Sequence, residues 1–180
     1  ASRAIEGLAQ EKRVVLGETT GIVTIEESGI RYQVDVLEGQ KTGFFFDQRE
    51  NRLALRDLVK GRRTLDCFCY VGAWAFSAAK FGATEIIGID SSEKAVQRAT
   101  RNAALNDLSA RFVAGDVFEK LREFEKQKER FGCIILDPPA FVKSRAKVRE
   151  ALKGYKEINL RAMRMLEAGG ILVTCSCSHH

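Results

Sequence analysis

The chain has 180 residues with 45% hydrophobic and 29% charged residues, which suits one domain with a small appendage and a sizeable core. No run approaches the roughly 18 apolar residues of a membrane span, and no apolar N-terminal stretch indicates a signal peptide, so we expect a cytoplasmic protein with no membrane partner. The net charge of +5 points to an anionic partner, and the odd number of cysteines, five, argues against a disulfide framework.

Residues 21–60 predict a small β-rich module with a helix, preceded by a short N-terminal helix and linker over residues 1–20. Two stretches of β-forming residues are separated by Ser28-Gly29, which is typical of a hairpin turn. Residues 49–59 then predict a helix that leads into the rest of the chain. The two β-rich stretches are residues 21–27 and 30–37.

From Gly61 onward, apolar runs alternate with segments of helical period. The runs indicate strands at residues 63–68, 85–89, 110–114, 133–136 and 171–175, and the intervening helices include residues 73–81, 93–105 and 119–130. Nearly continuous Ile, Leu and Val are expected of strands buried on both faces, and strand–helix alternation indicates a parallel sheet with right-handed crossovers. The predicted class is α/β: an open, doubly wound, mostly parallel Rossmann-like sheet over residues 61–180, preceded by a small β-rich α+β module.

Acidic and thiol side chains follow the ends of these strands. In an open α/β sheet, ligands bind beyond the carboxyl ends of the strands. For any single residue, a helix cap or turn is the more common role, and Ser91 or Ser92 is first of all a candidate N-cap. Five strands that deliver such groups to one edge favour a ligand site; the groups are Asp66, Asp90 with Ser91, Asp116, Asp137 and Cys175-Ser176-Cys177.

The turn after the first strand indicates the ligand. A dinucleotide site would use Gly-x-Gly-x-x-Gly to approach a pyrophosphate, but this turn contains only Gly72. Asp90 still stands where a carboxylate takes a ribose hydroxyl pair. A nucleoside with a cationic group fits, and S-adenosylmethionine (SAM) is such a ligand: its ammonium would be met near Asp66 and its adenine amino group by Asp116.

Both prolines of the chain lie in Asp137-Pro138-Pro139-Ala140-Phe141. Proline fixes φ and lacks a donor, so this pair predicts a stiff, extended loop after the fourth strand. Such a loop can hold a base plane against Phe141 while Asp137 bonds an exocyclic amine. A plain strand-ending turn is the alternative.

A basic window follows this loop. Residues 141–164 hold eight basic and two acidic residues, a net charge of +6, with Lys143 and Arg145 nearest the loop. A solvated helix face would explain the charge alone. Its position directly after the proline loop favours binding of a polyanion, and Pro138, Pro139, Phe141, Lys143 and Arg145 are the candidate substrate-binding residues.

Longer motifs occur in the order found in one known family. They are Lys41-Thr42-Gly43-Phe44-Phe45-Phe46-Asp47-Gln48-Arg49, Asp66-Cys67-Phe68-Cys69-Tyr70-Val71-Gly72, Asp137-Pro138-Pro139-Ala140-Phe141, Gly154-Tyr155-Lys156-Glu157-Ile158-Asn159 and Ser176-Cys177-Ser178. Together they resemble the bacterial 23S ribosomal RNA cytosine-C5 methyltransferases, class I SAM-dependent enzymes linked to a PUA domain. The resemblance runs from about residue 21 to 180 and implies SAM as cofactor and 23S ribosomal RNA as partner.

The resemblance also implies residue roles. The family's nucleophile is the cysteine of Ser-Cys-Ser, which corresponds to Cys177. A thiolate that adds to C6 of cytosine makes C5 enamine-like and able to attack a methyl group, and Asp137 would bind N3 and N4. The base that removes the C5 proton stays unassigned, and Cys175 is interpreted as packing. The motifs place Gln48, Phe68, Tyr70, Gly72 and Asp137 among the candidate cofactor-binding residues.

By the same resemblance, the chain lacks the PUA domain, and also the helix and strand pair that would follow the fifth strand. The fifth strand would then be a sheet edge, which invites pairing with another chain. We therefore expect self-association, and cofactor binding that is stronger than catalysis.

Other functions fit parts of the pattern. Asp-Pro-Pro loops also serve methyltransferases of exocyclic amines, which need no cysteine, and a catalytically weak RNA- and SAM-binding fragment is a further alternative. The missing glycines exclude a nicotinamide-dependent dehydrogenase. We predict no metal site, because no C-x₂-C spacing occurs and, with the fourth strand between the first and the fifth, the pairs Cys67/Cys69 and Cys175/Cys177 would lie about 10 Å apart.

Overall fold

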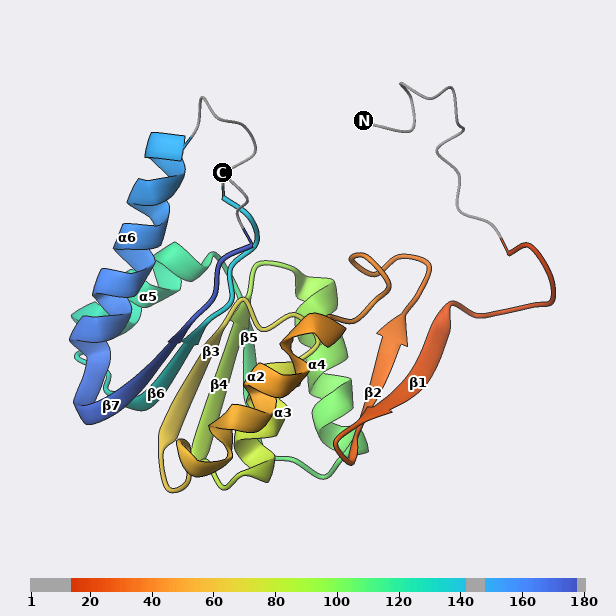
Figure 1. The fold of residues 1–180 in the computed structure, drawn as a ribbon, viewed down its shortest axis with the longest axis horizontal. Helices are drawn as coiled ribbons and strands as arrows, with labels where there is room; N and C mark the ends of the chain where they lie inside the picture. The colour runs from red at the N-terminus through yellow and green to blue at the C-terminus, as the bar shows by residue number, and fades with distance from the viewer. Residues whose placement is uncertain (1–13, 142–147, 178–180) are drawn as a thin grey trace.

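The computed structural model describes residues 14–141 and 148–177 (Figure 1). It begins with an antiparallel hairpin of β1 (Ile22–Glu27) and β2 (Ile30–Asp35), joined at the predicted Ser28-Gly29 turn. Of the expected N-terminal helix and linker, only residues 14–20 are described, and they form no helix. None of the described helices is long and apolar enough to cross a membrane.

The predicted helix at residues 49–59 is shorter and irregular. The 3-10 turn η1 (Phe46–Gln48) leads into α2 (Arg49–Leu53), which tightens into a second 3-10 turn, η2 (Ala54–Asp57). Leu58 and Val59 close this turn on the carbonyl of Leu55. The segment therefore spans the predicted length without forming one continuous α-helix.

The rest of the chain forms a five-stranded sheet in the order β5-β4-β3-β6-β7, with every pair parallel. The α/β prediction is confirmed, and the fourth strand of this sheet lies between its first and fifth strands. The strands are β3 (Arg63–Cys67), β4 (Glu85–Asp90), β5 (Arg111–Ala114), β6 (Phe131–Leu136) and β7 (Leu166–Thr174). Four match their predicted positions within two residues at each end.

The strand predicted at residues 171–175 is longer at its start. Leu166 pairs with Phe131, and after a register shift Ile171 pairs with Cys133. Gly169 and Gly170 lie within this irregular part. Glycine weakens a strand and often marks a bend or bulge, so the sequence did not indicate that β7 begins to pair with β6 before these two residues.

Four helices connect the strands: α3 (Ala73–Lys80), α4 (Glu93–Leu105), α5 (Val117–Lys126) and α6 (Val148–Met165). Side-chain caps fix two of their starts, because Ser92 accepts the Ala95 N–H and Asp116 accepts the Glu119 N–H. The cap at Asp116 explains why α5 starts two residues before the predicted residue 119.

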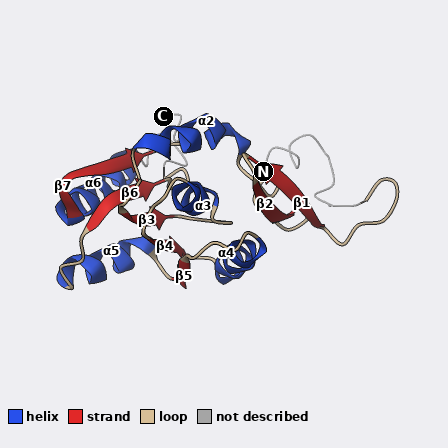
Figure 2. Ribbon diagram, turned by 90° about the horizontal axis from the view of Figure 1, so that it is seen from below, coloured by secondary structure: helices blue, strands red, loops and turns tan. Residues whose placement is uncertain are grey.

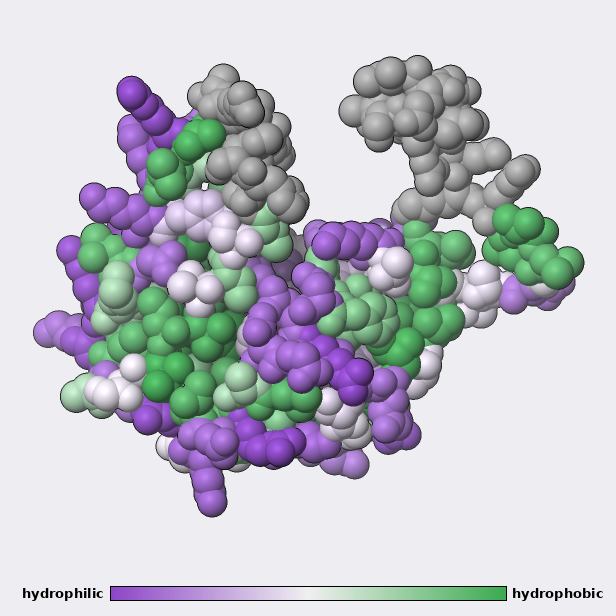
Figure 3. All heavy atoms as spheres, in the orientation of Figure 1, coloured by the Kyte–Doolittle hydropathy of each residue, from purple (hydrophilic) through white to green (hydrophobic). Residues whose placement is uncertain are grey.

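The helices cover the sheet unequally. Leu65, Ile87 and Ile134 point to one face and pack against α5 and α6, whereas Cys133 and Ile135 point to the other face and pack against α3 and η2. Figure 2 shows α5 on one side of the sheet and α2 and α3 on the other. Over β6 and β7, that second face carries hydrophobic residues at the surface (Figure 3).

A buried ion pair fastens the hairpin to the helical segment that follows it. Arg52 of α2 is 2% exposed and Glu27 of β1 is 8% exposed. Arg52 Nε and Nη2 donate to the two Glu27 oxygens at 2.9 and 2.8 Å, and Nη2 also donates to the Phe45 carbonyl at 3.1 Å. Because the charges are paired at two points, their burial is tolerated, and the hairpin and the loop at Phe45 are held together.

Side chains of α4 and of its C-cap residue satisfy the outer edge of β2. Asn102 Oδ1 accepts the Gln33 N–H at 2.8 Å, and Asn106 accepts the Arg31 N–H at 2.8 Å while its amide donates to the Arg31 carbonyl at 2.7 Å. These asparagines take the place of a third strand, so the hairpin packs against α4 with its edge paired.

Candidate cofactor and active site

The loop after β3 has an unusual backbone. Phe68 and Tyr70 have φ values of 66° and 49°, and Gly72 has 90°. Left-handed conformations are costly for residues with a side chain and are concentrated at functional sites. A Cβ at Gly72 would lie 2.6 Å from the ring of Phe76, so only glycine fits there. The loop is thus held tightly at the carboxyl end of the sheet.

Asp90, at the end of β4, is oriented by this loop. Its Oδ2 accepts the Tyr70 N–H and its Oδ1 accepts the Ser92 N–H, both at 2.9 Å. The side chain remains partly exposed. Each carboxylate oxygen can accept a second hydrogen bond, so Asp90 is a fixed acceptor pair for a diol. Ser92, rather than Ser91, caps α4, and Ser91 is exposed beside it.

Asp66 is fully buried in β3. Its Oδ2 accepts the Ala75 N–H at 3.0 Å, and its Oδ1 has no hydrogen-bond partner among the described residues. Burial raises the pKa of Asp66 well above its usual value, and Asp137 and Asp90 raise it further. A buried oxygen without a partner needs a donor from a bound molecule or an ordered water, which fits a cationic ligand at this edge.

Three further candidate cofactor-binding residues have hydrogen-bond partners of their own. Asp116 is exposed at the carboxyl end of β5, where its Oδ1 accepts the Glu119 N–H at 3.0 Å. Gln48 accepts from the Asn51 amide at 2.7 Å. Tyr70 points to the hairpin side, where its hydroxyl accepts the Gln40 N–H at 3.0 Å and its ring meets Phe45 at 5.6 Å.

Asp137 follows β6 and is held by two elements. Its Oδ2 accepts the indole N–H of Trp74 at 2.9 Å, and the Cys175 thiol donates to the same carboxylate. Burial raises the pKa of Asp137; Trp74 opposes this shift and Asp47 adds to it. Trp74 was not a predicted site residue, although it is the one tryptophan in the chain and lies in the first turn of the helix after Gly72.

The proline loop is anchored by an aromatic cluster. Phe141 packs against Tyr155 of α6 at a centroid distance of 4.6 Å, against Phe118 at 5.7 Å and against Phe68 at 6.2 Å. Pro138 is buried and Pro139 is exposed. The predicted substrate-binding residues Lys143 and Arg145 lie outside the described residues.

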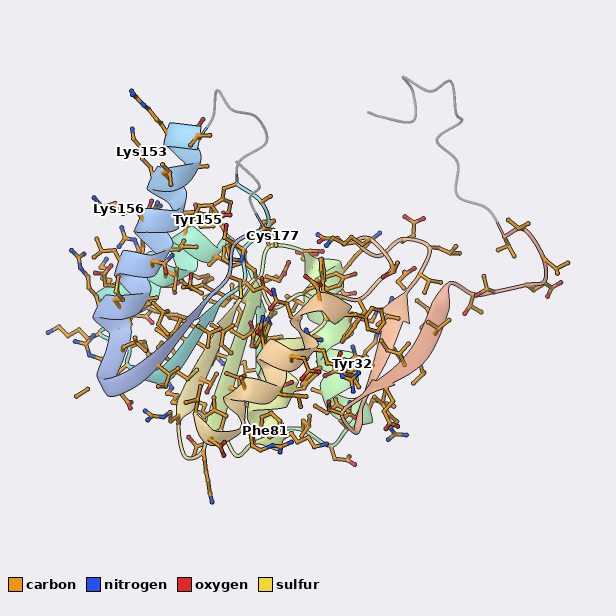
Figure 4. The ribbon with its side chains drawn as sticks, viewed as in Figure 1. Tyr32, Phe81, Lys153, Tyr155, Lys156 and Cys177 are labelled. Atoms are coloured by element: carbon orange, nitrogen blue, oxygen red, sulfur yellow. The ribbon has the colours of Figure 1, made fainter. Side chains whose placement is uncertain are left out.

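Cys177 is exposed just beyond β7, at the same end of the sheet (Figure 4). Burial raises the pKa of its thiol, as do Asp137 and Asp47, whereas Lys41 lowers it. The structure thus brings Cys177, Asp137 and the Lys41–Asp47 segment together, although they are far apart in sequence. Sequence reasoning missed Lys41 and Asp47 as site residues, and their place in a recurring motif was the available signal.

The other cysteines differ from Cys177 in environment. Cys67, Cys69 and Cys133 are buried, Cys175 is partly buried, and all five are free. Burial raises the pKa of Cys133 and of Cys175 to about 12, so both stay protonated at neutral pH. Within residues 14–141 and 148–177, no three His, Cys, Asp or Glu side chains gather as a metal site.

The opposed charges around Cys177 predict opposite effects on its reactivity. Lys41→Gln should raise the thiol pKa and slow alkylation, whereas Asp47→Asn should lower the pKa and speed it, because the thiolate is the reactive form. Iodoacetamide labelling of Cys177, followed by mass spectrometry between pH 7.5 and 9.5 (roughly the range in which thiols titrate), measures both. Lys60→Gln is the matched control. Rate changes of the same sign in both variants would contradict this electrostatic account.

Comparisons with known proteins identify the family of the chain. A model of the family described as S-adenosylmethionine-dependent methyltransferase matches residues 9–179. The Ribosomal RNA large subunit methyltransferase I of Aeromonas hydrophila is 45% identical over 183 residues, which is 99% of this chain and 46% of that protein. The protein of the same name from Photobacterium profundum is 45% identical, over 99% of this chain and 46% of its own length.

A solved structure also resembles the chain. The structure of SMU.776 complexed with SAH matches with a TM-score of 0.77 and 27% identity, and the match covers 88% of this chain and 43% of that one. The present chain spans about half the length of the curated relatives that it matches, 46% in both cases given.

Proposed function

The chain belongs to the S-adenosylmethionine-dependent methyltransferase family, and from that premise we propose that it methylates C5 of a cytosine in 23S ribosomal RNA, in the cytoplasm, through a covalent adduct with Cys177. The observation that carries the proposal is the meeting of an exposed thiol, Cys177, with a carboxyl group of raised pKa, Asp137, at the carboxyl end of the sheet. The relatives that bear the name of a large-subunit ribosomal RNA methyltransferase support RNA as the substrate.

The residues around the β3 loop fit SAM. Asp90 would take the ribose hydroxyls, Asp116 the adenine amino group, and the surroundings of the unpartnered Asp66 oxygen the ammonium. The bound cofactor supplies a methyl group on a sulfonium sulfur, which is an electrophile. Ser91, Gln48, Phe68, Tyr70 and Gly72 would shape the walls of this site.

Cys177 and Asp137 would activate the base. The Cys177 thiolate adds to C6, and the electron pair of the C5–C6 double bond becomes available at C5. The raised pKa of Asp137 favours its protonated form, and in that form it would donate to N3 and accept from the N4 amine, which would stabilise the adduct. C5 would then form a bond to the methyl carbon, and the electron pair of the bond between that carbon and the sulfonium sulfur would stay on the sulfur. Loss of the C5 proton to a base restores the double bond and expels Cys177.

The proline loop would position the base for this addition. Phe141 is fixed by Tyr155 at 4.6 Å, so it forms a firm wall, and the exposed Pro139 lies within reach of a ligand. Lys143 and Arg145 remain proposed RNA contacts.

Methylation of an exocyclic amine is the second candidate function. Asp137 directly precedes the proline pair, and its carboxylate could accept an amine N–H of adenine or guanine. That reaction needs no thiol, so the two candidates differ in their requirement for Cys177. A fragment that binds RNA and SAM with weak catalysis is the remaining alternative.

Cofactor affinity tests the role of Asp90. Asp90→Ala should weaken SAM binding by about 1–3 kcal/mol, the scale of a hydrogen bond to a charged group, while NAD should not bind the unchanged protein. Isothermal titration calorimetry measures both. Asp57→Ala, which removes an exposed carboxylate from η2, is the control. Equal SAM affinity in the Asp90 and Asp57 variants would exclude Asp90 from the site.

We also propose that the module of residues 21–60 and the sheet of residues 61–180 act as one catalytic unit that self-associates through β7. Among the described strands, β7 pairs only with β6. Cys175 N–H donates to Leu136 O on the inner side, so by strand alternation the Thr174 N–H points to the free edge.

Thr174→Pro should therefore block edge pairing without removing a ladder hydrogen bond of the monomer. Sedimentation velocity over a range of protein concentrations should show association of the unchanged protein and its loss in this variant. Thr174→Val keeps the N–H and should still associate. Association that persists in Thr174→Pro would rule out β7 as the interface.

A further inference from the structure

The basic residues of α6 divide into two groups with different surroundings. In the C-terminal half, Arg161 pairs with Glu125 of α5 and with Glu157, and Arg164 pairs with Glu125 at 3.2 Å. Glu157 also pairs with Arg122 at 2.8 Å. These charges are used within a network that joins α5 to α6, so this half of the helix offers little free positive charge.

The N-terminal half is different. Arg149, Lys153 and Lys156 are exposed, and none forms an ion pair with a carboxylate in the part of the chain that the structure describes. Figure 4 shows the side chains of Lys153 and Lys156 extending from the upper half of α6 into solvent. Glu150 is the one acidic residue of this half.

This free charge adjoins the candidate substrate loop. Tyr155, between the two lysines, packs on Phe141 at 4.6 Å. Gly154 lies beside the Phe141 ring, since a Cβ built there would stand in van der Waals contact with it at 3.4 Å. Figure 4 places Tyr155 on the Cys177 side of α6 and the lysines on its outer side. A nucleic-acid strand that crosses the N-terminal end of α6 can therefore contact both the lysines and the loop.

We propose that Lys153 and Lys156, with Arg149, bind the phosphate backbone of the RNA next to the target nucleotide. The proposal rests on the proposed function. The two lysines stand one helical turn apart, with a rise of about 4.5 Å along the axis, so their flexible ammonium groups can meet successive phosphates of one strand. Contacts of this kind set affinity and register without reading sequence.

Salt dependence of RNA binding measures these contacts directly. Each lysine–phosphate contact adds about 0.7–0.9 to the slope of log affinity against log salt concentration. Lys153→Gln/Lys156→Gln should therefore lower the slope by about 1.4–1.8 and weaken binding about tenfold at low salt. The probe is protein-free 23S ribosomal RNA in filter binding, with SAM affinity by calorimetry as the check on folding.

The matched control is Lys60→Gln/Lys126→Gln, which removes the same charge from exposed lysines before β3 and at the end of α5, at the opposite end of the sheet. This variant should keep the full slope. Equal slopes in the two double variants, or no RNA binding by the unchanged protein, would overturn the inference.

The proposed function can fail separately. If the slope falls only in the α6 variant but the unchanged protein does not methylate C5, the RNA contact stands and the cytosine-C5 reaction is wrong. If the unchanged protein methylates C5 and both double variants bind alike, the reaction stands and the α6 contact is wrong.

Discussion

Replacing Cys177 by alanine should abolish methyl transfer to cytosine C5, with a loss of about 10³-fold or more, the scale seen when a covalent nucleophile is removed. Without a thiolate at C6, C5 has no means of becoming nucleophilic. Transfer of radioactive methyl groups from SAM to 23S ribosomal RNA, with nucleoside analysis of the product, measures the loss. Calorimetry should show unchanged SAM affinity, because Cys177 lies with the proposed base-binding residues.

Cys175→Ala is the matched control, because it removes a neighbouring thiol from the same segment after β7. Cys175 is partly buried and its pKa is raised to about 12, so it should not replace the nucleophile. RNA that carries 5-fluorocytosine should trap a covalent complex with the unchanged protein and with Cys175→Ala, but not with Cys177→Ala. Undiminished product in Cys177→Ala would favour methylation of an exocyclic amine.

Replacing Arg52 by methionine should reduce the free energy of unfolding by about 3–5 kcal/mol, because it leaves a buried carboxylate unpaired. Glu27 is 8% exposed and accepts three hydrogen bonds from Arg52, at 2.9, 2.8 and 2.7 Å. Urea denaturation at pH 7, roughly three units above the usual pKa of a glutamate, measures the change. The variant should also loosen the loop at Phe45, whose carbonyl accepts from Arg52.

Two variants test whether the unpaired charge is the cause. Arg52→Met/Glu27→Leu removes both charges and should recover most of the lost stability, since a buried pair can often be replaced by apolar side chains at little cost. Arg49→Met removes an exposed arginine 3.9 Å from Glu50 and should change stability by less than about 1 kcal/mol. A loss in Arg52→Met no larger than in Arg49→Met would contradict this account.

Local signals predicted most of the fold. The helix α4 was predicted with its observed bounds, because Ser92 caps its start and the apolar alanines recur with helical period. The strand β6 was recognised because every one of its residues is buried, which requires an apolar run. The early start of β7 was missed, because Gly169-Gly170 has the composition of a turn. The residues before it are strand only because they pair with β6, a contact that the local sequence does not encode.

The sequence predicted which residues gather at the candidate site, but not which side chains contact one another there. Topology alone brings Asp90, Asp137 and Cys177 to one edge, so their gathering could be expected. The indole of Trp74 on Asp137 joins residues 63 positions apart, and the ion pair of Arg52 joins residues 25 apart. No periodicity encodes such pairs. The charge network of α5 and α6 likewise could not be separated from free positive charge in the sequence.

The proposed cofactor-binding residues and the proposed base-binding residues lie in two different segments of the sequence. With the exceptions of Gln48 and Asp137, the residues proposed for the cofactor lie between Asp66 and Asp116, and those proposed for the target base lie after Leu136. The two sets meet where β3 and β6 pair, and there the Asp137 N–H reaches the Cys67 carbonyl at 3.4 Å. If these assignments hold, substitutions after Leu136 other than at Asp137 should change the choice of nucleotide while SAM binding is kept.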